Sequence, residues 1–270
     1  MTEPFVKDQA EPSILFIDFW QNEMAGLVAG FTRRAEGVSG KPFNSFNFGL
    51  HTNDKKENVI KNRELLAERL DFPLTDWVLA EQIHGTEIAV AGKEECGRGT
   101  MDLNTAIKGV DGLVIDQSGI LCAAFFADCV PLFFLDVKKQ IAGIAHAGWR
   151  GTVGGMAGKM IERLLAMGSE LQDLRVAIGP CISGDNYEVD NRVIEQIPEK
   201  FRPLVVKHLA EERFLLDLRK LNHSLLLEAG VKDEQIEVTE RCTFADEDDF
   251  YSYRRDQGNT GRMLGFIGFK

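Results

Sequence analysis

The chain has 270 residues, of which 44% are hydrophobic, so it can bury the core of one large domain or of two small ones. Its formal net charge is −11 and it has no basic block, which argues against a protein that binds nucleic acid or an anionic membrane. Residues 1–12 are polar, and the apolar run at 14–19 is too short for a signal peptide or a membrane span, so we expect a cytoplasmic protein.

The first half of the chain is predicted to consist mainly of strands. Apolar runs predict strands at 14–19 and 27–32, followed by a loop at 33–49 whose phenylalanines argue against disorder. A helix is expected from about residue 53 to residue 70, with Pro73 just beyond its end. Further strands are expected at 77–83, 87–91, 109–116 and 120–127.

The second half mixes strands and helices. Residues 132–135 and 140–145 are apolar throughout or nearly so, as in strands buried on both faces, and His146 stands where the second strand ends. Thr152 is the expected N-cap of an amphipathic helix that runs to residue 167. The remaining predicted elements are a strand at 174–178, helices at 190–197 and 217–229, and strands at 236–239, 250–253 and 263–269. Since no repeat or linker divides the chain, we predict one domain over residues 1–270 with an α+β (mixed α/β) fold.

Polar residues stand at three of these strand ends, and they are His84, the pair Asp128-Cys129, and His146. Separate strands of one sheet can end at the same edge, so these side chains can converge although they lie far apart in sequence. Two imidazoles and a thiolate suit Zn²⁺, and three protein ligands leave a fourth position for water, whose pKa the metal would lower to roughly 7. The alternative is that Cys129 is a buried structural thiol and His146 an ordinary strand-end histidine.

Asp128 is the only charged residue between 117 and 135, and a lone acid in an apolar run needs a partner. It either orients a ligand histidine or pairs with Arg150. Arg150 stands beside the expected helix start, where backbone N–H groups and a guanidinium attract anions. Gln82 either hydrogen-bonds the substrate or a ligand, or is a strand-end polar group that faces solvent.

Seven short motifs occur along the chain. They are QIHG at 82–85, ADCVP at 127–131, HAGWRG at 146–151, GPCI at 179–182, an FTRR…SFNFG segment at 31–49, NR at 62–63 and TGRMLGFIG at 260–268. Together they resemble the laccase-domain family, the YfiH-like proteins once described as multicopper polyphenol oxidoreductases. The resemblance covers nearly the whole chain and implies a single α/β domain with a mixed β-sandwich core flanked by helices. It also implies a metal held by His84, Cys129 and His146.

The resemblance further implies purine nucleoside chemistry, and the two imidazoles and the thiolate make zinc the expected metal. The expected reactions are phosphorolysis of adenosine, inosine, guanosine and methylthioadenosine, and deamination of adenosine. Asp128 and Arg150 are the expected catalytic residues, with Arg150 holding phosphate, whereas Gln82 and Arg33 are expected to bind substrate. Purine nucleosides and phosphate are therefore the expected partners, with no nucleic acid and no membrane.

Three other functions stay open. A metal-independent cysteine hydrolase would use Cys129 as its nucleophile and His146 as its base. The same two histidines and cysteine suit a blue-copper site, so copper is the second choice of metal. A full multicopper oxidase also needs a trinuclear cluster, for which only His51, His208 and His223 remain. In a non-enzymatic partner-binding protein the trio would be structural and no nucleoside would be converted.

Overall fold

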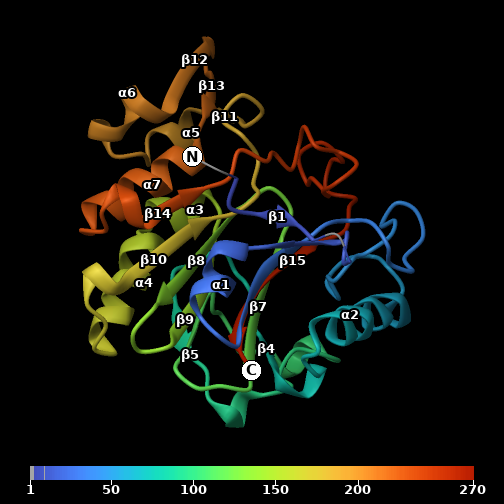
Figure 1. Ribbon diagram of the computed structural model, residues 1–270. Helices are drawn as coiled ribbons and strands as arrows, with labels where there is room; N and C mark the ends of the chain where they lie inside the picture. The colour runs from blue at the N-terminus through green and yellow to red at the C-terminus, as the bar shows by residue number, and fades with distance from the viewer. Residues whose placement is uncertain (1–2, 9) are drawn as a thin grey trace.

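Two six-stranded β-sheets stacked face to face form the centre of the computed structural model, which describes residues 3–8 and 10–270 (Figure 1). The first sheet contains, in spatial order, β1 (Val6–Lys7), β2 (Ile14–Phe16), β3 (Leu27–Thr32), β15 (Met263–Phe269), β7 (Ile120–Phe126) and β4 (Trp77–Leu79). The second contains β14 (Ile236–Val238), β10 (Leu174–Ile178), β8 (Val130–Asp136), β9 (Ile141–Ala147), β6 (Gly112–Ile115) and β5 (Ile88–Val90). Both sheets are mixed, because β4 runs parallel to β7, β5 to β6 and β10 to β14, whereas the other pairs are antiparallel.

Large apolar side chains fill the layer between the sheets. Phe126 of β7, Phe133 of β8 and Ile144 of β9 meet there, and none is more than 1% exposed. The strands β7, β8, β9 and β15 are buried at every position, because the opposite face of each sheet is covered as well. This double burial explains why these strands have nearly unbroken apolar sequences.

Helices cover the outer faces of the sandwich. Helix α2 (Lys56–Leu70) packs with the loop phenylalanines Phe46 and Phe48 on the first sheet. Helices α3 (Trp149–Val153), α4 (Met156–Ala166) and α7 (Leu218–Glu228) cover the second sheet (Figure 1). The shorter helices are α1 (Asp18–Glu23), α5 (Asn191–Ile194) and α6 (Arg202–Val205), with 3-10 turns at Leu74–Asp76, Lys93–Glu95, Leu103–Thr105, Leu171–Asp173, Glu199–Phe201 and Asp233–Gln235. The predicted combination of a mixed β-sandwich core with flanking helices is confirmed.

Several local predictions were wrong. The helix expected at 152–167 is divided into α3 and α4 at Gly155, whose φ of +84° favours glycine. Thr152 is not its N-cap, because α3 begins after Gly148 and the Thr152 side chain is buried between Ala147 and Asn222. The apolar run at 14–19 splits into β2 and α1.

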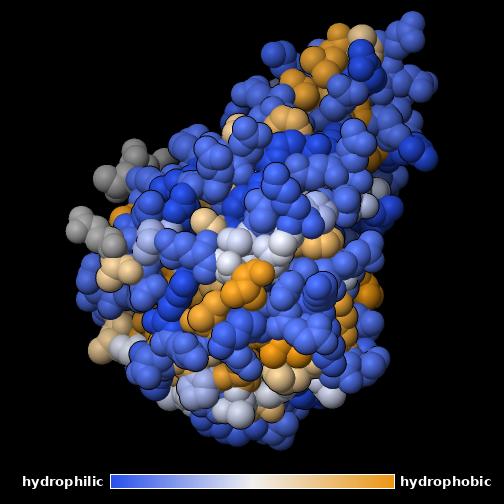
Figure 2. Space-filling model, turned by 90° about the vertical axis from the view of Figure 1, so that its right-hand side faces the viewer, coloured by the Kyte–Doolittle hydropathy of each residue, from blue (hydrophilic) through white to orange (hydrophobic). Residues whose placement is uncertain are grey.

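Two further segments differ from expectation. Residues 250–252 join no sheet and Tyr253 begins a turn, and the N–H of Tyr251 donates to the sulfur of Met263 instead of a strand carbonyl. A small sheet of β11 (Glu188–Asp190), β13 (Arg213–Leu216) and β12 (Val206–Ala210) forms a lobe that the sequence did not predict. This lobe projects from the molecule in Figure 2 and carries the exposed side chain of Leu209, and Leu204 of the preceding helix α6 is exposed as well. In the part of the chain that the structure describes, no helix has the length and apolar character needed to cross a bilayer.

Candidate functional site

The three predicted ligand residues meet at one end of the sandwich, where the chain passes between the sheets. His84 lies on the segment that leads from β4 in the first sheet to β5 in the second. Cys129 lies on the turn from β7 in the first sheet to β8 in the second, and His146 stands near the end of β9, paired with Pro131 of β8. One donor atom from each residue lies within 4.8 Å of the others. The structure thus brings the trio together.

Gly148 leaves the space that a metal ion at this trio needs. A Cβ added at this position would lie 2.9 Å from Nδ1 of His84 and 3.0 Å from Sγ of Cys129. Any larger residue would therefore intrude between two of the three donors. The donor set of two imidazoles and a thiolate also matches the ligands that zinc takes, so the residues present fit a metal ion.

Asp111 organises the trio, and sequence reasoning missed it. Its buried carboxylate accepts hydrogen bonds from the backbone N–H groups of Ile83 (3.1 Å), His84 (3.0 Å) and Gly85 (2.7 Å). It also accepts from Nδ1 of His146 at 2.9 Å, which leaves Nε2 of that ring as the free donor atom. One carboxylate therefore fixes both the segment of His84 and the ring orientation of His146, as partners of metal-ligating histidines commonly do.

Cys129 and His146 shift the pKa of one another. Burial would raise the pKa of the Cys129 thiol, but the charge of His146 and hydrogen bonds from His146 and His84 outweigh it and lower the pKa to about 6. Burial would lower the pKa of His146, but the thiolate and Asp111 raise it to about 9. A pKa of about 6 favours the thiolate at pH 7, the form that binds metals and attacks electrophiles.

The trio opens into a cavity of about 670 Å³, within the range of small-molecule binding sites. Its walls combine aromatic rings with arginines. The lining residues are His51, Ala80, Glu81, Gln82, His84, Leu103, Phe125, Ala127, Asp128, Cys129, His146, Tyr187, Tyr253, Arg254 and Arg262.

Comparison with known protein families shows where the chain belongs. The family model described as multi-copper polyphenol oxidoreductase laccase matches residues 28–270. The chain belongs to this laccase-domain family. The resemblance inferred from the seven motifs is thereby confirmed.

Similar proteins agree in sequence and in structure. A protein of Geobacillus stearothermophilus named purine nucleoside phosphorylase YlmD is 46% identical over 255 residues, covering 90% of each chain. The protein of the same name from Bacillus subtilis is 41% identical over 266 residues, covering 96% of this chain and 95% of that one. The crystal structure of YlmD from Geobacillus stearothermophilus has a TM-score of 0.94 at 43% identity and covers 100% of both chains.

Within this laccase-domain fold, Asp128 has partners other than the two expected from the sequence. Its Oδ1 accepts from the hydroxyl of Thr243 at 2.7 Å, and its Oδ2 accepts from the hydroxyl of Ser252 at 3.0 Å and the N–H of Arg254 at 2.7 Å. It therefore neither orients a ligand histidine, which Asp111 does, nor pairs with Arg150. Asp128 instead ties the turn of Cys129 to the loop that carries Arg254.

Gln82 lines the cavity, but its amide is occupied by the backbone of Phe125. Its Nε2 donates to the Phe125 carbonyl at 2.9 Å and its Oε1 accepts from the Phe125 N–H at 2.7 Å. This pair of bonds joins the segment of His84 to the end of β7. The geometry favours a positioning role for Gln82 over direct substrate binding.

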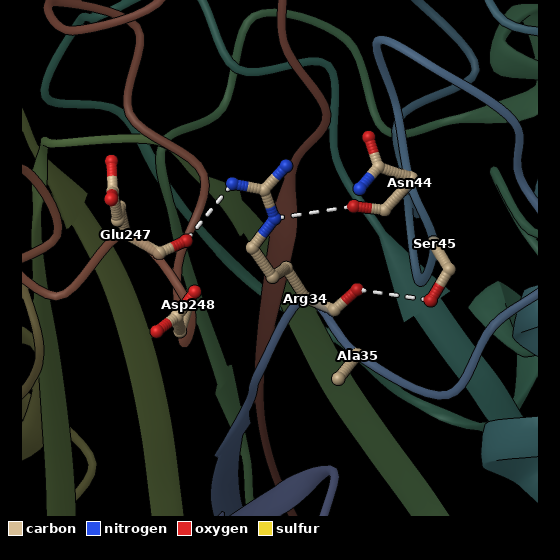
Figure 3. A pocket seen from close by; sticks show the side chains of 6 residues that line it. All are labelled: Arg34, Ala35, Asn44, Ser45, Glu247 and Asp248. Carbon is tan, nitrogen blue, oxygen red and sulfur yellow. Dashed lines mark hydrogen bonds between the residues drawn. The ribbon is translucent and has the colours of Figure 1, made fainter.

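The arginines expected to bind phosphate or substrate lie outside this cavity. Arg150 is exposed and stacks on Trp149 at 4.4 Å, and α3 is too short to present a helix N-terminus of consequence. Arg33 is paired with Asp249 and donates to the carbonyl of Pro12 at 2.6 Å. Arg34, which follows Arg33 in the chain, lines a separate pocket and donates to the carbonyls of Asn44 and Glu247 (Figure 3).

The cavity wall contains two other arginines and a histidine, none of which was predicted from the sequence to bind substrate. Arg254 lies over the ring of Tyr187 at 5.0 Å, and Arg262 lies 5.6 Å from the ring centre of Tyr253. The side chain of His51 keeps access to solvent. The surrounding protein nevertheless desolvates the ring, and this effect, together with the positive charges of Arg262, Arg63 and His146, lowers its pKa to about 4. Its imidazole is therefore neutral at pH 7.

The remaining family motifs support these walls. Asn47, in the SFNFG segment, accepts from the backbone N–H of Arg262 at 2.9 Å. Arg63, in the NR motif, is fully buried and donates to the carbonyls of Phe48, Gly99 and Thr100. In the GPCI motif, the N–H of Ile182 donates to the main-chain carbonyl of Asp128 and so holds that turn. Burial raises the pKa of the Cys181 thiol in the same motif to about 11, as in an unreactive thiol.

Proposed function

We propose that this laccase-domain protein is a zinc-dependent purine nucleoside phosphorylase that acts on adenosine, inosine, guanosine and methylthioadenosine and also deaminates adenosine. One observation supports this function above all. The donor atoms of His84, Cys129 and His146 face one another within 4.8 Å and line a cavity large enough for a nucleoside. Relatives that share nearly the whole chain are named purine nucleoside phosphorylases.

Zinc is the metal that we propose, although the family description refers to copper. Three of the four zinc ligands would come from the trio, which leaves one position open. A multicopper oxidase needs further histidine clusters, but His208 packs on Phe214 in the lobe and His223 pairs with Asp233. Among the described residues, the trio is the one group of three or more potential ligands that converges.

In phosphorolysis a phosphate oxygen forms a bond to C1′ of the ribose while the C1′–N9 bond to the purine breaks and the purine takes a proton. In deamination a water oxygen replaces the amino group at C6, which leaves as ammonia. A zinc ion supplies Lewis-acid activation when bound. The protein's own part is to fix the donors through Asp111, to hold the turn of Cys129 through Asp128, and to surround the substrate with the aromatic and cationic cavity wall.

A metal-independent cysteine hydrolase is the second candidate, because the Cys129 thiolate beside a protonated His146 is also the arrangement of a nucleophile and its acid–base partner. The two candidates differ in metal requirement. A hydrolase of this kind would keep its activity after a chelator has removed the metal.

The test is product analysis by chromatography beside metal analysis of the purified protein. Adenosine is incubated with and without phosphate, and we expect adenine only with phosphate but inosine in both. Cys129→Ala should form neither product, whereas Cys96→Ala, which changes a half-buried thiol that does not line the cavity, serves as the control and should form both. Absence of both products from metal-loaded protein would refute the proposed function.

A further inference from the structure

The cavity beside the trio holds two arginines without a carboxylate partner. Among the ion pairs of the described residues, none involves Arg254 or Arg262. The two acids of the cavity wall are used elsewhere, since Asp128 accepts three hydrogen bonds and Glu81 lies 3.7 Å from Lys108. Neither carboxylate of the cavity wall therefore forms an ion pair with the two arginines.

Both guanidinium groups are held in the same way. The Nη1 of Arg254 donates to the carbonyl of Glu188 at 2.6 Å, and the Nη1 of Arg262 donates to the carbonyls of Thr260 and Gly261 at 2.9 Å. Their Nε and Nη2 groups donate no hydrogen bond to the described part of the protein. In each arginine the anchored nitrogen leaves the Nε–Nη2 edge free.

That free edge is the one with which arginines of this protein bind oxyanions. Arg192 donates from Nε at 2.9 Å and from Nη2 at 2.6 Å to one carboxylate oxygen of Asp190. A phosphate group offers the same kind of acceptor with more oxygens and more charge. Both arginines line the same cavity, so their free edges together offer hydrogen-bond donors for an oxyanion there.

The surroundings favour an anion as well. Arg63 lies beneath the Phe125 ring of the cavity wall, 5.1 Å from its centre, and is charged and buried without a carboxylate partner among the described residues. In a cavity walled by protein, the field of such charges is screened less than at an open surface. The main-chain N–H of Arg254 is held by Asp128, next to the ligand Cys129, so this arginine has a fixed place relative to the trio.

We propose that the Nε–Nη2 edges of Arg254 and Arg262 bind a phosphoryl oxyanion in the same cavity as the trio. This inference rests on the proposed phosphorylase function, for which the oxyanion is orthophosphate, the attacking substrate. The same chemistry would also hold the phosphate ester of a nucleoside monophosphate. Arg150, the arginine favoured from the sequence, is not part of this site.

The first arm of the test measures binding without turnover. Inorganic phosphate is titrated into metal-loaded protein, and the melting temperature is compared with that in sodium chloride of equal ionic strength. We expect a saturable rise in the wild type and about a ten- to hundredfold weaker apparent affinity in Arg254→Gln and Arg262→Gln. Arg254→Lys should recover part of the affinity for phosphate, since lysine keeps the positive charge but cannot form the bidentate hydrogen bonds of the Nε–Nη2 edge. Arg192→Gln, on the surface, is the matched control and should bind phosphate as the wild type does.

The second arm identifies the source of the oxyanion. With inosine as substrate, the KM for phosphate should rise in both variants, while the KM for inosine at saturating phosphate and the metal content should stay near wild type. If instead only the binding of inosine 5′-monophosphate weakens, the same site holds a nucleotide ester. The inference is overturned if both ligands bind equally well to wild type and to both folded variants, or if neither ligand binds the wild type. If phosphate binds through these arginines but no nucleoside is converted, the proposed function fails and the oxyanion site stands.

Discussion

Replacing Asp111 with asparagine is expected to weaken both the fold and the metal centre, because each carboxylate oxygen serves two donors. Oδ1 accepts from the N–H of His84 at 3.0 Å and from Nδ1 of His146 at 2.9 Å. Oδ2 accepts from the N–H of Ile83 at 3.1 Å and of Gly85 at 2.7 Å. Asparagine keeps one oxygen, so in either orientation its NH₂ group faces two donors and two hydrogen bonds are lost.

The expected magnitude follows from that count. A hydrogen bond to a charged partner contributes about 1.5–3 kcal/mol, so losing two lowers the free energy of unfolding by about 3–6 kcal/mol. This is a large part of the roughly 5–15 kcal/mol by which domains are stable. Metal affinity should fall about 10- to 100-fold, since His146 loses the acceptor that orients its ring.

Urea denaturation measures the first quantity, and competition with a chelator measures the second. Asp136→Asn is the matched control, because Asp136 is equally buried but lies at the far end of β8. Its Oδ1 accepts from the N–H groups of Lys138 and Lys139, while its Oδ2 has no partner and can be replaced by NH₂. If Asp111→Asn retains wild-type stability and metal affinity, the organising role assigned to this carboxylate is wrong.

Three further predictions concern the trio itself. Metal-loaded protein should contain about one zinc per chain, and Cys129→Ala and His84→Ala should lose it; full zinc occupancy in both variants by elemental analysis would show that the ligand assignment is wrong. Cys129 should resist iodoacetamide until a chelator removes the metal, because ligation engages the thiolate; rapid labelling of metal-loaded protein with matched loss of activity would favour the hydrolase. Gly148→Ala should lower metal affinity with little change in circular dichroism, since its Cβ would lie 3.0 Å from the Cys129 sulfur. Gly158→Ala, whose added Cβ would meet nothing within 4 Å, should bind metal as the wild type does, and equal affinities in the two variants would contradict the steric argument.

The trio could be found from the sequence because Cys129 and His146 lie at the ends of apolar runs, and because His84 follows the strand predicted at 77–83, which in the structure is the shorter β4. A polar side chain at the end of a buried strand has few places to go other than the edge of the sheet. Asp111 was not identified from the sequence as a site residue, although it lies just before the apolar strand β6, as Asp128 lies just after β7. The rule that a lone acid needs a partner applied to both, but only the folded chain shows which partner each acid meets.

The cavity arginines could not be predicted in this way. Arg254 and Arg262 lie on a loop without periodicity, and their positions depend on distant groups, Asp128 for one and Asn47 for the other. Arg150 was favoured because a helix start was expected beside it, but the break at Gly155 makes that helix a single short turn. The hairpin of β12 and β13 was missed because its turn, with Glu211 at a φ of +30°, carries none of the usual glycine or asparagine signals.

Two of the three proposed metal ligands lie on segments that connect the two sheets, and this makes the site sensitive to how the sheets pack on each other. His84 and Cys129 sit on chain segments that leave one sheet for the other, whereas His146 belongs to the second sheet alone. A small slide of one sheet over the other would therefore change the distances among the donors, even if each sheet kept its hydrogen bonds. Volume changes at Phe133 or Ile144, deep between the sheets, should then alter metal affinity without touching a ligand. The absorption spectrum of a cobalt ion bound in the site would report changes in donor geometry, and therefore how rigidly the two sheets keep their relative position.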